Sequence, residues 1–407
     1  MRILVAVDHW FPDHRGGAAR VAAETARLLA QHGHDVEVLA PVDPTRRPLE
    51  REGSLAVHRV LRRGALPQTL TDPWETRRAA LGRTADLAIA HASTTAVGLS
   101  SALPQVPLAL VFHASAAREA RFLRSRLPPG RRRAAALALE PLLALLERRA
   151  LRGAGRVLVL SDFSRRLLAA DHPDALPRTR LVGGGVDTHV FTPGDRGAAR
   201  RRLGLPPDAP LLLTVRRLEP RMGLELLLEA FAILRAARPE LELAIVGDGS
   251  LRRKLVERRA GLGLEQAVRL AGRVPEDELV DWYRAADLFV LPTLAYEGFG
   301  LVTAEALACG TPVVGTPVGA TPELLLPLDE RLLAAGAGAG DLAAAIERGL
   351  LLATPAFGRR CRVYAESRLS WAAAFPGWHE ALTDVPDDRS VRPASSRGAG
   401  GPVPVLR

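Results

Sequence analysis

The fold class is indicated most clearly by residues 288–314, which read LFVLPTLAYEGFGLVTAEALACGTPVV. The first four residues, Leu288–Leu291, are all apolar, as expected of a strand that is buried on both faces of a parallel sheet. A glycine-containing loop follows, and the apolar pattern then predicts a helix from about Phe299 to Ala308 and a second strand at Pro312–Val314. This order of strand, helix and strand is the repeating unit of doubly wound α/β folds.

The same alternation runs upstream to about residue 196. It predicts strands at Leu211–Val215, Leu243–Val246 and Val268–Ala271, and helices at Leu224–Ala237, at Glu276–Ala285 and in a segment that ends near Leu262. We therefore expect residues 196–370 to form one Rossmann-like domain around a parallel sheet.

The first half of the chain shows a separate series of strands and helices. Its predicted strands are Ile3–Val7, Val36–Ala40, Leu87–Ala90, Leu108–Phe112, Arg156–Leu160 and Arg180–Val182. A helix after Gly16-Gly17 is expected to end at the C-cap Gly33, and a long helix is expected over residues 131–152. Residues 1–185 are thus predicted to form a second Rossmann-like domain. The two domains would face each other across a cleft, with ligands at the carboxyl ends of the strands.

The composition is that of an ordinary globular protein. Of the 407 residues, 47% are hydrophobic and 25% are charged, and no apolar stretch reaches the roughly 20 residues of a membrane-spanning helix. We also expect no signal peptide, and the two distant cysteines, Cys309 and Cys361, favour neither a disulfide framework nor a zinc site. A cytoplasmic location is therefore predicted. Residues 384–407, rich in Pro, Gly, Ser and Asp, are expected to be a disordered tail.

The net charge of +10 comes almost wholly from arginine, which is concentrated in one segment. From Arg118 to Arg133, seven arginines stand against one acidic residue, Glu119, which gives a local charge of +6. Such a segment suits an anionic membrane surface at the inner face of the cell membrane, or an acidic acceptor, and equally a solvated helix face. Nucleic acid is not expected as a partner, because the segment contains a single aromatic residue, Phe122, and no recognition motif stands nearby.

Two carboxylates, Glu297 and Glu305, stand eight residues apart across the junction of loop and helix. Glycines at this junction let backbone N–H groups approach a ligand, and the helix dipole favours negative charge there, so a diphosphate fits. The residues predicted to bind it are Gly298, Phe299, Gly300 and Leu301. Glu305, about two turns into the helix, can accept hydrogen bonds from both hydroxyls of a ribose, and Glu297 can hold a sugar hydroxyl. A functional role explains why a carboxylate stands inside an apolar helix, where burial without a partner is costly.

A second set of phosphate ligands is predicted directly after the strand Leu211–Val215. Arg217 and Arg221 follow this strand, and arginine binds phosphate oxygens in a bidentate manner while remaining charged. They suit a diphosphate at the carboxyl edge of the sheet. The turn Gly247-Asp248-Gly249 after the next strand is interpreted as structural.

Taken together, these residues resemble the retaining glycosyltransferases of family 4. The segment from Glu297 to Glu305 is similar to the E-x7-E motif of that family. Further similar stretches are Gly185-Val186-Asp187 to Phe191, Arg217 to Gly223, Val246-Gly247-Asp248-Gly249, Ala271 to Pro275, Ala286 to Pro292 and Glu305 to Val314. The resemblance covers most of residues 180–325 and, more loosely, the first half of the chain.

The resemblance implies two Rossmann-like domains of the GT-B type and a carboxyl-terminal helix, residues 371–383, that crosses back to the first domain. It also implies residue roles. Glu305 would bind the ribose, Glu297 the transferred sugar and Arg217 the diphosphate. In the first domain, Gly16 and Gly17 would let the backbone approach the phosphates, and His113 would lie near the sugar. Glu297, His113 and Arg217 are thus the candidate catalytic residues.

The sequence departs from the family pattern at three positions. Met222 stands where a lysine is usual before the glycine of the phosphate loop, Arg216 where glycine is common, and Gly184 where asparagine is usual before Gly185. The absence of the lysine removes one phosphate partner. Our hypothesis is that Arg221 compensates, in which case Met222→Lys should change donor affinity little.

The expected reaction is transfer of a sugar from a nucleoside diphosphate to an unidentified acceptor, lipid-linked or polysaccharide, by a hexosyltransferase-type enzyme. Arginines and N–H groups aimed at the departing diphosphate would stabilise its charge. No cluster with metal-ligand spacing stands out, so no metal or other cofactor is predicted. The resemblance implies retention of anomeric configuration, with the leaving phosphate accepting the acceptor's proton.

Two alternatives come from other functional classes. A sugar-nucleotide epimerase of the same fold would show a similar nucleotide-binding half, and it would form product without any acceptor. A nucleotide-sugar-binding protein that has lost activity would bind the donor without releasing its nucleotide.

Overall fold

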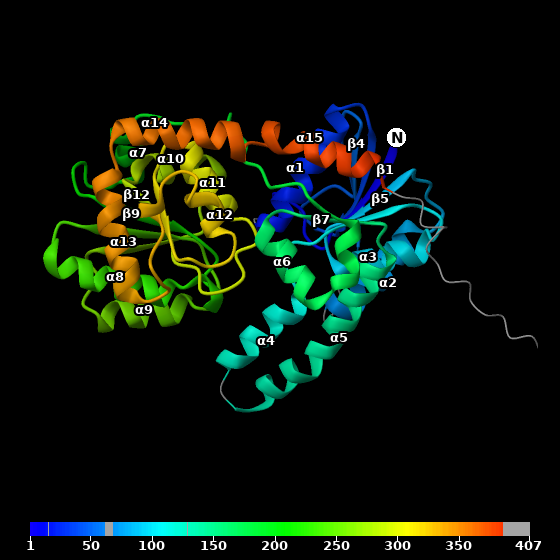
Figure 1. Ribbon diagram of the computed structural model, residues 1–407, viewed down its shortest axis with the longest axis horizontal. Coiled ribbons are helices and arrows are strands. Elements are labelled where there is room, and N and C mark those ends of the chain that lie inside the picture. Colours follow the sequence, from blue (N-terminus) through cyan, green and yellow to red (C-terminus); the bar gives the residue numbers. More distant parts are fainter. Residues whose placement is uncertain (15, 62–67, 128, 386–407) are drawn as a thin grey trace, which may run out of the picture.

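The computed structural model describes residues 1–385 except 15, 62–67 and 128. Within these residues the chain forms two α/β lobes, each built around its own sheet, which confirms the predicted fold class (Figure 1). The predicted tail at 384–407 lies outside the described residues except for Asp384 and Val385.

The described part of the first lobe contains an eight-stranded sheet in the order β3-β4-β2-β1-β5-β6-β7-β8. Its strands are β1 (Arg2–Ala6), β2 (Asp35–Pro41), β3 (Leu49–Glu52), β4 (Leu55–Leu61), β5 (Leu87–Ala90), β6 (Leu108–Val111), β7 (Arg156–Val159) and β8 (Thr179–Leu181). Its helices are α1 (Gly17–Gln31), α2 (Gln68–Ala80), α3 (Ser93–Ala102), α4 (Ala116–Arg126), α5 (Arg131–Gly153) and α6 (Asp162–Asp171). The central strands β5, β6 and β7 are buried throughout because helices cover both faces of the sheet.

The second lobe contains a five-stranded parallel sheet in the order β11-β10-β9-β12-β13. Its strands are β9 (Leu211–Val215), β10 (Glu242–Val246), β11 (Val268–Gly272), β12 (Leu288–Leu291) and β13 (Val313–Gly315). Its helices are α7 (Arg196–Leu203), α8 (Leu224–Ala237), α9 (Arg252–Gly261), α10 (Glu276–Ala285), α11 (Leu301–Ala308), α12 (Thr321–Leu325), α13 (Ala339–Leu352) and α14 (Pro355–Tyr364). The strand order reverses direction beside β9, and such a switch point is where ligands bind in open α/β sheets.

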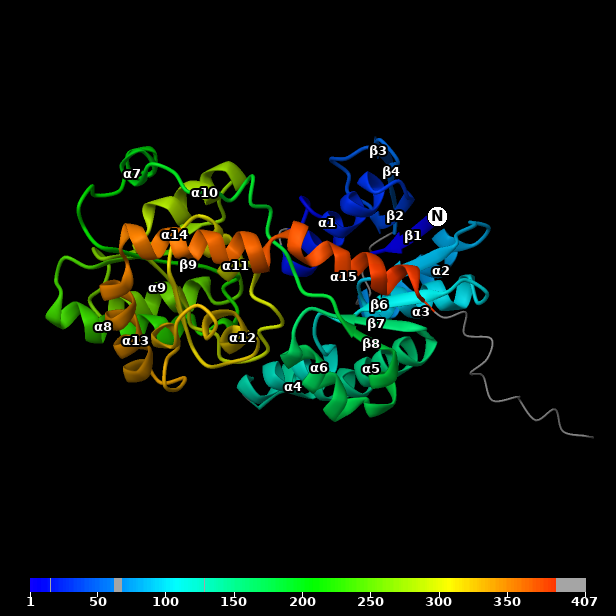
Figure 2. The same cartoon turned by 45° about the horizontal axis from the view of Figure 1, so that its top comes forward.

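The chain returns to the first lobe at its end. Helix α15 (Trp371–Thr383) begins at the N-cap Ser370 and lies along the first lobe (Figures 1 and 2). The indole N–H of Trp378 donates to the Gly183 carbonyl at 3.0 Å, and Phe375 packs on the ring of His32 with 4.3 Å between ring centroids. The second lobe is therefore joined to the first by two chain crossings.

Most predicted elements match the structure, and the differences have physical causes. The antiparallel hairpin of β3 and β4 was not expected, because β3 reads LERE and lies at the sheet edge with little burial. Helix α11 begins at Leu301 and not near Phe299, because Gly300 adopts a left-handed conformation with φ of +93°. Glu305 is therefore only about one turn into the helix.

One buried arginine aligns the strands that carry the site. Arg200 of α7 is 1% exposed and binds Asp287, which precedes β12, at 2.9 Å. The same carboxylate accepts from the backbone N–H of Leu211 at the start of β9 at 2.8 Å. The other donors of Arg200 reach the carbonyls of Pro206, Pro207, Ala209 and Ala285. This network fixes the amino-terminal ends of β9 and β12, and thereby the register of their carboxyl ends.

The substitution Arg200→Met should destabilise the second lobe by about 3–5 kcal/mol, because it leaves four carbonyls without their donor and removes the buried partner of the Asp287 carboxylate, which keeps Arg196. The neighbouring Arg201 is exposed, so Arg201→Met is the matched control and should change the unfolding free energy by less than about 0.5 kcal/mol. Thermal or urea unfolding measures both. Equal midpoints for the two variants would contradict the role of Arg200.

Candidate active site

The loops after β9, β10 and β12 are packed against one another at the carboxyl edge of the second sheet. A Cβ atom on Gly247 would lie 1.9 Å from the carbonyl oxygen of Arg216, and one on Gly223 would lie 1.7 Å from that of Pro292. Only glycine permits such backbone contact, so the three loops hold one another in place. The side chains of Arg216 and Glu297 are thereby brought into contact.

Glu297 lies on the loop after β12 and is largely buried. Its Oε2 is 2.8 Å from Nη2 of Arg216 and accepts from the Thr293 hydroxyl at 3.0 Å. Burial alone would raise the pKa of the Glu297 carboxyl, but the charge and hydrogen bond of Arg216, with the charge of Arg221, lower it. Glu297 is thus held as a carboxylate.

Glu305 lies on α11, 4% exposed, at the boundary between the two domains. The hydroxyl of Tyr283 from α10 donates to its Oε2 at 2.7 Å, and Nε of Arg20 from α1 lies 3.8 Å from its Oε1. Arg20 also binds Glu276 at 2.6 Å and stacks on Phe11. Burial raises the pKa of Glu305, and Arg20 and Tyr283 only partly offset this effect. Each oxygen keeps lone pairs for a further donor.

The two arginines predicted for the diphosphate differ in environment. Arg217 is exposed, and its side chain forms no ion pair with any residue that the structure describes. Arg221 donates to the Tyr296 carbonyl at 3.0 Å and pairs with Glu119 of α4 at 3.2 Å. Arg217 is therefore available to an anion, whereas Arg221 already joins the two domains.

His113 follows β6 and faces a second histidine. Its Nε2 is 3.2 Å from Nδ1 of His91, so one ring donates to the other. Burial lowers the pKa of His113 to about 4, against an opposing effect of Asp8. His113 is consequently neutral at pH 5–8 and can offer a hydrogen bond but not a charge.

The start of α11 meets the first domain directly. The Gly298 carbonyl accepts from Ser161 at 2.6 Å and from Ser164 at 3.3 Å. A Cβ on Gly298 would lie 2.8 Å from the His113 carbonyl oxygen, and one on Gly17 would lie 3.5 Å from a methyl group of Leu301. Gly298 and Gly17, predicted from different domains, thus each lie at the domain boundary against a residue of the other domain. Gly16 is the N-cap of α1, next to Gly17.

Gly184, one of the departures from the family pattern, has a steric explanation. A Cβ at this position would lie 2.6 Å from the ring of Phe299, which is itself 8% exposed at the start of the site. An asparagine at residue 184 would require Phe299 to move.

A further set of hydrogen bonds and an ion pair joins the two domains near these residues. Glu323 of α12 accepts from the backbone N–H groups of Asp162 and Phe163, at 2.9 and 2.6 Å, at the start of α6. Its pair with Arg166 at 2.9 Å adds to this contact. Together with the contacts of Arg20 and Arg221, these interactions hold the two domains in direct contact, with the cleft between them closed at this position.

Sequence patterns missed several members of this site. Arg20, Tyr283, His91 and Glu323 carry no recognisable motif, and only the fold brings them to the predicted residues. Among the residues that the structure describes, no cluster of three His, Cys, Asp or Glu side chains is arranged to hold a metal ion.

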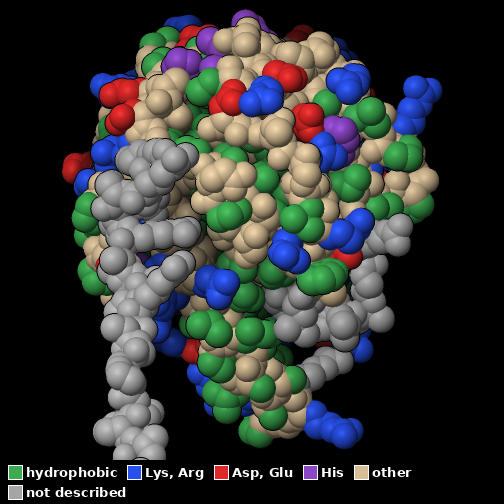
Figure 3. All heavy atoms as spheres, turned by 90° about the vertical axis from the view of Figure 1, so that its right-hand side faces the viewer, with side chains coloured by type: hydrophobic (Ala, Val, Ile, Leu, Met, Phe, Trp, Pro, Cys, Tyr) green, Lys and Arg blue, Asp and Glu red, His purple; other side chains and the backbone are tan. Residues whose placement is uncertain are grey.

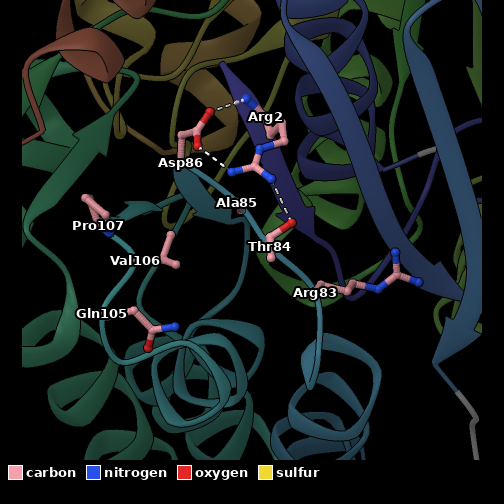
Figure 4. Close-up of a pocket in the computed structure, with 8 residues that line it drawn as sticks. All are labelled: Arg2, Arg83, Thr84, Ala85, Asp86, Gln105, Val106 and Pro107. Atoms are coloured by element: carbon pink, nitrogen blue, oxygen red, sulfur yellow. Dashed lines mark hydrogen bonds and ion pairs between the residues drawn. The ribbon is translucent and has the colours of Figure 1, made fainter.

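A separate pocket of about 400 Å³ opens at the opposite edge of the first sheet (Figure 4). It is lined at the amino-terminal ends of β1 and β5, where Arg2 already binds Asp86 and Thr84 at 2.7–3.0 Å. It lies away from the carboxyl ends of the strands and carries none of the predicted site residues.

Both halves of the chain match family models of glycosyltransferases. The family model described as Glycosyltransferase Family 4 matches residues 15–189, and that described as Glycosyl transferases group 1 matches residues 195–368. D-inositol 3-phosphate glycosyltransferase 1 of Catenulispora acidiphila is 32% identical over 389 residues, 90% of this chain and 88% of the relative. The match to D-inositol 3-phosphate glycosyltransferase 2 of the same organism, 38% identical, spans only about half of each protein, 56% of this chain and 56% of the relative.

Solved structures share the fold at low sequence identity. Sucrose-phosphate synthase of Thermosynechococcus elongatus superposes with a TM-score of 0.78 at 22% identity, over 93% of this chain and 98% of that one. Anabaena HepE, solved in complex with UDP and glucose, gives 0.73 at 20% identity, over 94% and 100%. The chain therefore belongs to the family 4 glycosyltransferases and has the two-domain GT-B fold.

Proposed function

We propose that this glycosyltransferase takes its sugar from a nucleoside diphosphate and transfers it with retention of configuration, without a metal ion. One observation carries the proposal. Two carboxylates, the largely buried Glu297 and the buried Glu305, flank the start of α11, and the exposed Arg217 stands on the loop after β9 at the same edge of the sheet. A nucleoside diphosphate sugar supplies the matching groups, namely ribose hydroxyls, a diphosphate and sugar hydroxyls.

The donor would lie across the carboxyl edge of the second sheet. Glu305 would accept the hydrogen bonds of the ribose hydroxyls, and the diphosphate would lie between Arg217 and the N–H groups at the start of α11. Glu297, fixed by Arg216, would hold a hydroxyl of the transferred sugar. His113 would approach the sugar from the first domain as a neutral hydrogen-bonding partner.

Cleavage of the bond between sugar and phosphate places extra charge on the departing diphosphate. Arginine and backbone N–H groups that are already in position stabilise this charge more in the transition state than in the ground state. Since the lowered pKa of about 4 makes His113 a weak base and Glu297 is held by Arg216, the departing phosphate itself is the base that we propose for the acceptor's proton. Transfer on the same face then retains the anomeric configuration.

Thermal unfolding in the presence of chelator tests donor binding. One nucleoside diphosphate among UDP, GDP and ADP at 100 times its Kd should add about 2.7 kcal/mol of stability and raise the midpoint by a few degrees. Arg217→Gln should reduce this shift, whereas Arg253→Gln, at a highly exposed helix position, is the matched control and should not. A shift that appears only after manganese is added would refute metal independence, and no shift with any nucleotide would refute the donor class.

The first acceptor to assay is D-inositol 3-phosphate, because the relatives carry its name. Release of nucleotide with this acceptor but not without it would distinguish a transferase from an epimerase and from an inactive binding protein. The anomeric configuration of the product would test retention.

A specific surface supports a second proposal, that the acceptor lies at an anionic membrane. Helices α4 and α5 form a hairpin that projects from the first lobe (Figure 1). On this hairpin Leu123, Leu137 and Leu145 are 43%, 56% and 59% exposed. Figure 3 shows hydrophobic side chains with basic ones beside them at this lower end of the molecule. No helix of the described residues is long and apolar enough to cross a membrane.

Long-range pairing reduces the positive charge expected of this segment. Arg118 pairs with Asp171, and Arg121 and Arg124 both pair with Glu140. Arg131 and Arg133 are exposed and form no ion pair with a described residue, and Arg126 stacks on Phe122. The local count of +6 therefore overstates the free charge, which is carried by the arginines around the hairpin tip.

Binding to anionic vesicles tests this surface. Neutralising Arg126, Arg131 and Arg133 to Gln should weaken binding by about 1 kcal/mol per arginine at low salt. Leu137→Glu with Leu145→Glu should also weaken it, whereas Leu351→Glu, at a 77% exposed leucine of α13, is the matched control. Binding that survives both sets of changes would show that the hairpin is a solvated surface and not a membrane contact.

A further inference from the structure

The two departures from the family pattern in the phosphate loop lie in contact with each other. Arg216 follows β9, and Met222 ends the short 3₁₀ turn Pro220–Met222 of the same loop. Nη2 of Arg216 is 2.7 Å from Sδ of Met222, and the two residues are 8% and 5% exposed. A positively charged side chain at residue 216 and one at residue 222 can therefore place their charge in the same part of the loop after β9.

The guanidinium of Arg216 is only partly committed to protein partners. Nη2 binds Glu297 at 2.8 Å, while Nε and Nη1 donate to none of the residues that the structure describes. Arginine carries five N–H donors in a planar fork, so donors remain for a second anion. Glu297 consequently orients the guanidinium without saturating it.

The charges around Arg216 leave room for an anion. Arg221 lies within electrostatic range of Arg216, Arg217 and Glu297, and it pairs with Glu119 of the first domain at 3.2 Å. Three cations thus face two carboxylates. The uncompensated positive charge lies at the carboxyl edge of the sheet, where the proposed function places the diphosphate.

We propose that Arg216 supplies the positive charge that binds the distal phosphate of the donor, in place of the lysine that is usual at position 222. The two departures from the family pattern would then compensate for each other, with the charge moved from residue 222 to residue 216. This inference rests on the proposed function and refines it. Arg217 and the start of α11 would hold the rest of the diphosphate. Arg221 would serve mainly to join the domains through Glu119, and it would not be the compensating residue.

A competing explanation gives Arg216 the opposite effect. Its side chain could fill the sugar site by pairing with Glu297, as expected of a protein that has lost activity. Removal of the guanidinium would then leave diphosphate binding unchanged or stronger. The two explanations predict opposite changes in the same measurement.

The test compares the Kd values of UDP and UMP, or of the ADP or GDP pair if that base is bound, by titration calorimetry with chelator present. The ratio of the monophosphate Kd to the diphosphate Kd reports the distal phosphate alone. Arg216→Gln should lower this ratio about tenfold, in the range of one hydrogen bond to a charged group. Arg216→Gly with Met222→Lys should restore it to within about threefold of the wild-type value, and Arg253→Gln is the surface control.

Two further variants keep the test decisive even if Arg216→Gln does not fold. Arg216→Lys keeps the charge and should retain most of the ratio if Arg216→Gln proves unstable. Met222→Lys alone should raise the ratio of the two Kd values less than threefold, because the Arg216 guanidinium already supplies the positive charge there. A double variant no better than Arg216→Gly, or an Arg216→Gln variant with an unchanged ratio, would overturn the proposal. Failure of the wild-type protein to bind any nucleoside diphosphate would instead refute the proposed function.

Discussion

The candidate active site depends on the buried carboxylate of Glu305, which lies on α11 between strands β12 and β13. A carboxylate in this position is stable only with partners, and they come from both domains. Tyr283 of the second domain donates at 2.7 Å, and Arg20 of the first domain lies 3.8 Å away while binding Glu276. The polar group that we assign to the ribose is thus also a point at which the two domains hold each other.

The closed arrangement brings the two halves of the proposed donor site together. Gly17 faces Leu301 across the boundary, and the carbonyl of Gly298 is held by Ser161 and Ser164. Glycine is required where backbones touch, as at Gly247 against the carbonyl of Arg216. The packed loops and backbone dipoles of the site are therefore held in place by the protein itself, as electrostatic stabilisation of a leaving group requires.

The sequence predicted the second domain better than the first. Leu211–Val215 and Leu288–Leu291 match strands β9 and β12 because fully buried parallel strands read as apolar runs. The polar edge strand β3 has no such pattern and was missed. The charge of the segment from Arg118 to Arg133 was overestimated, because its partners Asp171 and Glu140 are distant in sequence or lie beyond the segment. The contacts of Glu305 with Arg20 and Tyr283 also depend on tertiary structure, so no local pattern could reveal them.

The role of Glu305 is tested most directly by the affinities of the wild-type protein and of Glu305→Gln for a nucleoside diphosphate and for its 2′,3′-dideoxy analogue. Two hydrogen bonds to a carboxylate contribute about 1.5–3 kcal/mol each, so the wild-type protein should bind the analogue at least about a hundredfold more weakly. Glu305→Gln should bind the two nucleotides with similar affinity. A wild-type protein that ignores the hydroxyls, or a variant that still distinguishes them as strongly as the wild type, would contradict the account.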